Sequence, residues 1–107
     1  MPSNTRAIPA RGEYVNTTPD QGFEVRAWMV RELGLNGCEL LVYAAIRGFA
    51  GDGGCKMLEW SFLSELTGSS VSTCRRAVDS LVRKGLVEKI AVRTEAGDRN
   101  VFRMAAA

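Results

Sequence analysis

The clearest periodic segment of the chain runs from Val71 to Lys84, where apolar residues recur at helical spacing. At 100° per residue, several apolar side chains fall within about 80° of Cys74 and define one face. These are Val71, Ala77, Val78, Leu81 and Val82. The opposite, polar face carries Ser72, Arg76, Asp79 and Arg83, flanked by Thr73 and Ser80. With Ser70 as a favoured N-cap and Gly85 just beyond the end, the segment predicts an amphipathic helix with its aliphatic side chains inward.

A second helix is predicted over residues 37–49. Asn36 is a good N-cap, and Glu39 follows at the spacing of a capping box. The polar side chains of this segment, Glu39, Tyr43 and Arg47, form one narrow stripe on an otherwise apolar surface. Such a helix has to be covered on most sides, by the domain's own elements or by a partner chain. We therefore expect a homodimer that forms through helix 37–49.

Four segments favour extended backbone. Apolar and charged residues alternate over Phe23–Ala27, which predicts a short extended segment. Lys56–Leu58 is predicted as a brief strand. Leu86–Val92 is rich in strand-forming residues and Asn100–Met104 alternates again, so these two segments predict a β-hairpin.

The length of 107 residues fits one domain. We expect that domain over residues 21–104, between an N-terminal arm at 1–20 and a tail at 105–107. The arm is rich in Pro, Asn and Thr without an apolar period, so disorder is expected there. The longest uncharged apolar stretch, Leu40–Ile46, is too short to cross a membrane, and Met1–Ala10 lacks the apolar region of a secretory signal. A cytoplasmic protein is therefore expected.

The chain contains no histidine, which removes the commonest general base, the serine-type triads and most metal sites. Cys38, Cys55 and Cys74 are too few and too widely spaced for a disulfide framework or a zinc knuckle. We expect reduced thiols that fill small apolar gaps. The composition therefore predicts no enzyme, no cofactor and no metal site.

Charge is distributed unevenly along the chain. Residues 69–107 hold eight Lys or Arg against four Asp or Glu, whereas residues 1–68 hold six against eight. The net charge of +2 thus divides into +4 and −2. A domain with such polarity favours binding to a polyanion such as DNA, because neutralised phosphates release counterions.

The predicted elements include a short helix, a glycine turn and a longer helix in that order. Ser61 should cap the short helix over Phe62–Thr67, which Gly68 ends. This is the helix-turn-helix arrangement. It would present the outer face of helix 71–84 to the major groove of duplex DNA, which is about 12 Å wide.

The outer face of helix 71–84 carries groups suited to this role. Small hydroxyls near its N-terminus permit close approach, and a guanidinium forks onto guanine O6 and N7 or onto phosphate. We expect direct DNA contacts from Ser70, Ser72, Thr73 and Arg76. We expect phosphate or hairpin contacts from Arg75, Arg83, Arg93 and Arg99. The alternative for Arg76 and Arg83 is a solvated helix face, on which Asp79 and Arg83 form an ordinary i,i+4 ion pair. In a DNA complex, Asp79 would instead orient Arg76 or accept from cytosine N4.

The run LSELTGSSVSTCRRAVDSLVRKGLVEKI, residues 63–90, resembles the core of bacterial winged helix-turn-helix domains. The positions that match an inward leucine, a small residue, the turn and the exit into the wing are Leu63, Ser64, Gly68, Leu81 and Lys84–Val87. Ser69 departs from the branched apolar residue that many such motifs keep. That departure implies a turn that is less tightly packed.

The upstream run LGLNGCELLVYAAIRGF, residues 33–49, is similar to the first helix of helix-turn-helix domains in phage or plasmid replication initiators and primosome-component proteins. Together the resemblance covers Phe23–Met104. It implies an α+β fold with a three-helix core, a short strand and a C-terminal β-hairpin wing. It also implies that the wing, which in this family often touches the minor groove or phosphates, carries Arg93, Thr94, Arg99 and Asn100.

The function that the resemblance implies is a duplex DNA-binding module. It would act in replication initiation, with replication proteins as further partners, or in transcription regulation. The alternative is a winged-helix module that binds protein and no DNA, which the apolar helix 37–49 and the modest net charge keep open. No catalytic activity, cofactor, metal or membrane association is expected in either case.

Overall fold

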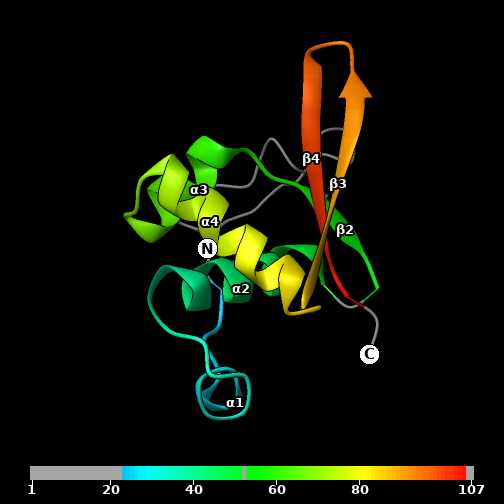
Figure 1. The fold of residues 1–107 in the computed structure, drawn as a ribbon. Helices are drawn as coiled ribbons and strands as arrows, with labels where there is room; N and C mark the ends of the chain where they lie inside the picture. Colours follow the sequence, from blue (N-terminus) through cyan, green and yellow to red (C-terminus); the bar gives the residue numbers. More distant parts are fainter. Residues whose placement is uncertain (1–22, 52, 106–107) are drawn as a thin grey trace, which may run out of the picture.

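The computed structural model describes residues 23–51 and 53–105, so the predicted arm over residues 1–20 lies outside the described residues. The elements are α1 (Ala27–Arg31), α2 (Gly37–Ala50), β2 (Cys55–Met57), α3 (Trp60–Thr67), α4 (Val71–Arg83), β3 (Val87–Thr94) and β4 (Gly97–Met104). The helices α2, α3 and α4 lie together, and the hairpin of β3 and β4 extends beyond them (Figure 1). This is the α+β winged helix-turn-helix that the sequence predicted.

Helix α4 forms where its periodicity predicted it. The Ser70 side chain accepts a hydrogen bond from the backbone N–H of Thr73 at 3.1 Å, and Gly85 takes a φ of 75° just beyond the C-terminal cap. The inward side chains Cys74, Ala77, Val78 and Leu81 are buried against α2 and α3. Val71 and Val82 were predicted to point inward as well, but they are 36% and 40% exposed. They lie at one edge of the apolar arc, roughly 60–80° from Cys74, where burial is incomplete.

The three strands form an antiparallel sheet in the order β2-β4-β3. Phe102 on the central strand pairs with Lys56 on one side and Lys89 on the other, and its side chain is fully buried. The hairpin is longer than predicted, because Thr94 pairs with Gly97 and leaves a two-residue turn. Gly97 has a φ of 111°, a conformation that L-residues with a side chain rarely adopt.

Helix α2 is central to the domain and is covered by the domain's own elements. Its residues 42–46 are all buried, and α4, α3, the sheet and α1 pack around it. Tyr43, predicted to lie in a polar stripe, is buried because Trp28 of α1 packs edge-on against its ring at 6.2 Å. The covering of α2 therefore needs no partner chain, and the homodimer through helix 37–49 stays a prediction.

The ends of the helices differ from the predictions in detail. The extended segment predicted over Phe23–Ala27 ends one residue early, because Arg26 is extended and α1 begins at Ala27. Asn36 is the N-cap residue of α2 as predicted, but its side chain makes no capping bond, and Glu39 bonds to α4 instead of closing a capping box. Ser61 lies inside α3, which begins one residue earlier behind the N-cap Glu59. At the start of α3, Trp60 in the first position packs edge-on against Phe102 at 5.8 Å, a tertiary contact that local capping signals do not include.

The cysteines differ in their surroundings. Cys74 is fully buried, with its Sγ 4.0 Å from that of half-buried Cys38 and 3.4 Å from Thr67 Oγ1. Cys55 is exposed at the start of edge strand β2, so the prediction that every cysteine fills an apolar gap was wrong for it. None of the helices within 23–51 and 53–105 is long and apolar enough to cross a membrane.

These surroundings predict an order of thiol reactivity. A maleimide should label Cys55 fastest, Cys38 more slowly and Cys74 only after unfolding, because desolvation raises the pKa of the Cys74 thiol. Mass spectrometry at successive times measures the order, and the chain in urea serves as the control, with similar rates for all three. Rapid labelling of Cys74 in the native protein would contradict the packing of α4.

Candidate nucleic-acid interface

The turn between α3 and α4 is held by polar contacts. Gly68 ends α3 in the left-handed region with a φ of 74°. Ser64 Oγ donates to the Ser69 carbonyl at 2.6 Å, and the Ser69 N–H donates to Thr67 Oγ1 at 3.2 Å. Ser69 therefore fixes the turn through its backbone, at the position where related motifs use an apolar side chain.

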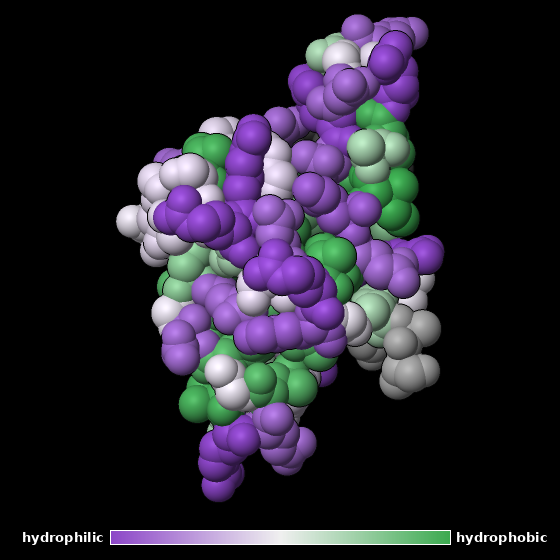
Figure 2. Space-filling model, in the orientation of Figure 1, coloured by the Kyte–Doolittle hydropathy of each residue, from purple (hydrophilic) through white to green (hydrophobic). Residues whose placement is uncertain are grey.

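The N-terminal turn of α4 carries a connected group of hydroxyls. Ser70 Oγ donates to Thr73 Oγ1 at 2.9 Å and lies 3.2 Å from Ser72 Oγ. Arg76 Nη2 donates to the same Thr73 oxygen at 3.3 Å. Ser70, Ser72 and Arg76 are exposed and Thr73 is half-buried, so the structure brings the four predicted direct-contact residues together. Figure 2 shows hydrophilic side chains over α4 and at the tip of the hairpin.

The other two arginines of α4 lie apart from this group. The Arg75 guanidinium carbon lies 5.3 Å from the centre of the Trp60 ring, which holds it at the side of the helix. Arg83 is exposed in the last turn. Its predicted ion pair with Asp79 was wrong, since Asp79 Oδ1 lies 3.9 Å from Lys89 Nζ on β3. Asp79 therefore pairs with Lys89 of the neighbouring strand β3 and not with a cation of its own helix.

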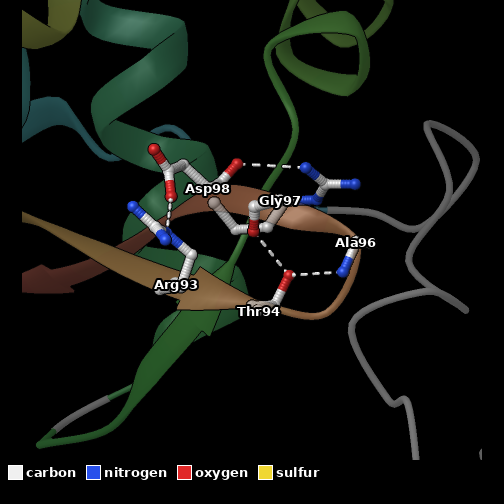
Figure 3. Close-up of polar contacts among 6 residues, drawn as sticks. Arg93, Thr94, Ala96, Gly97 and Asp98 are labelled. Carbon is white, nitrogen blue, oxygen red and sulfur yellow. Dashed lines mark hydrogen bonds and ion pairs between the residues drawn. The ribbon is translucent and has the colours of Figure 1, made fainter.

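Hydrogen bonds and an ion pair stabilise the tip of the hairpin (Figure 3). Arg93 Nε lies 2.6 Å from Asp98 Oδ1, and the Arg93 side chain is 84% exposed. Thr94 Oγ1 donates to the Gly97 carbonyl at 2.6 Å and accepts from the Ala96 N–H at 3.2 Å. Arg93 is thus presented at the tip with its charge balanced by a neighbour, while the Thr94 hydroxyl is used within the turn.

The second arginine predicted on the wing lies on the other face of the sheet. Arg93 pairs with Asp98, so Arg99, one residue further along β4, points to the opposite side. Its Nε lies 2.8 Å from Glu59 Oε2, just before α3. Asn100 shares the face of Arg93 and is half-buried. The structure therefore does not bring Arg93 and Arg99 together.

A contact that the sequence analysis missed joins α4 to α2. Ser80 Oγ donates to Glu39 Oε2 at 2.7 Å, and Lys84 Nζ lies 2.8 Å from the same oxygen. Burial raises the pKa of the Glu39 carboxyl, but the hydrogen bonds from Lys84 and Ser80 and the charge of Lys84 outweigh it, so its pKa lies below the ordinary value. The polar stripe of α2 gave the signal for Glu39, but the partner could not be identified from it.

Replacing Glu39 with Gln should therefore lower the free energy of unfolding at pH 7 by about 1 kcal/mol, since the partners are partly exposed. The carboxyl has a lower pKa in the folded state, so its contribution is present above the unfolded pKa of about 4.3 and is lost as pH falls through the folded value. Urea unfolding at pH 7 and at pH 3 measures this. Glu24→Gln is the control, because the Glu24 side chain is 72% exposed. A difference that is unchanged between the two pH values would contradict the contact.

Comparison with known proteins identifies one family. Residues 33–87 match a family model described as a helix-turn-helix domain. The matched segment runs from just before α2 through α4 to the first residue of β3, and it spans about half of the chain. Neither a curated protein nor a solved structure matches the chain. From its turn, its capped α4 and this match, the chain belongs to the helix-turn-helix domain family.

Proposed function

We propose that this domain binds duplex DNA, with α4 in the major groove and the hairpin beside the phosphate backbone. The observation that carries the proposal is the exposed N-terminal part of α4, where three hydroxyls and the Arg76 guanidinium are linked by hydrogen bonds. These groups present donors and acceptors of the kind that read base edges, while the other side of the helix is buried.

The distribution of cations supports the same proposal. Arg75, Arg76 and Arg83 are exposed on α4, and Arg93 is exposed at the tip of the hairpin. A backbone phosphate near the helix N-terminus would also meet the positive end of the helix dipole. Arg99 pairs with Glu59, so among the predicted DNA-contacting arginines it is the least available to a phosphate.

The biological process is proposed on narrower support. The resemblance drawn above for residues 33–49 is what supports a role in replication initiation, with replication proteins as partners, while the matching family model names only a helix-turn-helix domain. The alternative is transcription regulation. In both processes the domain would act by binding, as the homodimer expected through helix 37–49, and would catalyse no reaction.

The salt dependence of DNA binding tests the proposal. Fluorescence anisotropy of labelled duplexes from a random pool should show binding at 50 mM salt. The logarithm of the association constant should then fall linearly with the logarithm of salt concentration, with a slope of roughly −0.9 per neutralised phosphate. Absence of binding to any duplex at low salt would overturn the proposal and would favour the protein-binding alternative.

A further inference from the structure

The indole of Trp60 lies where the helix-turn-helix meets the hairpin. Trp60 is the first residue of α3, and its ring packs edge-on against Phe102 of β4 at an interplanar angle of 79°. The side chain is only half-buried. Part of the ring therefore contacts the core, and the remainder is available to groups from other elements.

Two cations from different elements lie against this ring. Arg75 of α4 has its guanidinium carbon 5.3 Å from the ring centre, and Lys89 of β3 has its Nζ at 5.7 Å. Both distances are within the range of a cation–π interaction. One cation of α4 and one cation of the hairpin thus both lie against the Trp60 ring.

Two cations and one carboxylate meet at this junction, so its net charge is positive. Like charges that share one ring repel each other, and the carboxylate beside them, Asp79, lies 3.9 Å from Lys89 and is 56% exposed. The Lys89 side chain is itself 35% exposed, so solvent and ligands reach it. An anion placed between α4 and the hairpin would be attracted to both cations.

We propose that Arg75 and Lys89 form a binding site for the phosphodiester backbone of a DNA strand that runs between α4 and the hairpin, and that Trp60 positions both cations for it. The site rests on the proposed function and specifies where the strand contacts the domain. Trp60 acts through the two cations, so it is a positioning residue.

Charge-neutralising variants of the two cations test the site. Arg75→Gln and Lys89→Gln should each weaken binding to every duplex by the same factor and reduce the salt slope by about 1, without changing base preference. Arg103→Gln is the matched control, because it removes the same charge from the sheet. Arg103 lies next to Phe102 on β4 and so points away from the helices, where it pairs with Glu88. The affinity and the salt slope of the Arg103→Gln variant should equal those of the wild type.

Variants of Trp60 separate positioning from packing. Trp60→Leu keeps an apolar side chain but removes the aromatic face, so it should weaken binding several-fold while the salt slope remains near that of the wild type. Trp60→Phe keeps an aromatic face and should restore most of the affinity. A role in packing alone would give no advantage to Phe over Leu once circular dichroism shows that both variants are folded.

The outcomes distinguish this site from the general proposal. If the wild type binds duplex DNA but Arg75→Gln and Lys89→Gln retain its slope as Arg103→Gln does, the junction site is wrong and DNA binding stands. Equal affinities of Trp60→Leu and the wild type would remove Trp60 from the site. If the wild type binds no duplex at low salt, both proposals are overturned.

Discussion

Replacing Phe102 with alanine is expected to lower the free energy of unfolding by about 3–5 kcal/mol. Phe102 is fully buried at the centre of β4, where both neighbouring strands pair with it, and Trp60 of α3 packs against its ring. Truncation would leave a cavity between the sheet and the helices that surrounding side chains fill only partly. Because a domain of this size is stable by roughly 5–15 kcal/mol, much of its stability would be lost.

Urea unfolding followed by circular dichroism measures this effect. The midpoint should fall in the variant, while the dependence of free energy on urea concentration should stay the same. Ile90→Ala on the adjacent strand is the control; Ile90 is 40% exposed, and its loss should cost less than about 1 kcal/mol. If the two variants lose equal stability, the packing of the hairpin base against the helices is wrong.

Helix α4 could be predicted almost to the residue because several local signals agree on it. The hydroxyl of Ser70 caps its first turn, Gly85 follows its end, and the apolar positions repeat at helical spacing between them. Each of these signals depends on neighbours within a few residues. The outward side chains of α4 were predictable for the same reason, since the helical period fixes their direction once the inward face is known.

The contacts between elements could not be predicted in this way. Glu39 meets Ser80 across 41 positions of sequence, and neither residue has a local pattern that names the other. Trp60 packs on Phe102 of the core, and its half-buried ring also lies against Arg75 and Lys89, which no local pattern names as its partners. Such pairings arise only when the helices and the sheet have been placed relative to one another.

The sequence could not show which hairpin side chains share a face, for a related reason. Side chains alternate along a strand, so the face of each residue follows from the register, and the register depends on the turn. The structure pairs Thr94 with Gly97, which places Arg93 and Arg99 on opposite faces. The predicted strands left residues 93–99 unassigned, so the pairing of these residues could not be derived from the sequence. The geometry of the wing was therefore the least predictable part of the candidate interface.

For DNA binding, the largest single-residue effect is expected from Arg76→Ala, which should weaken the binding of the preferred duplex by about 1–3 kcal/mol and relax base preference at one position. Arg76 is exposed on the outward face of α4, and its guanidinium lies against the Thr73 hydroxyl, so it can reach a base edge beside that hydroxyl. Selection of bound oligonucleotides from a random pool, with dissociation constants for the selected duplexes, measures both effects.

Arg31→Ala is the control for this prediction, because it removes the same charge from the exposed last turn of α1, which packs against α2 rather than α4. It should leave both affinity and base preference unchanged, apart from a small screened electrostatic effect. A uniform loss of affinity without relaxed preference would place Arg76 on a phosphate, since phosphate contacts carry no sequence information. Unchanged affinity would remove Arg76 from the interface. The linked hydroxyls at the N-terminus of α4 would then lack the charged partner that the proposal gives them.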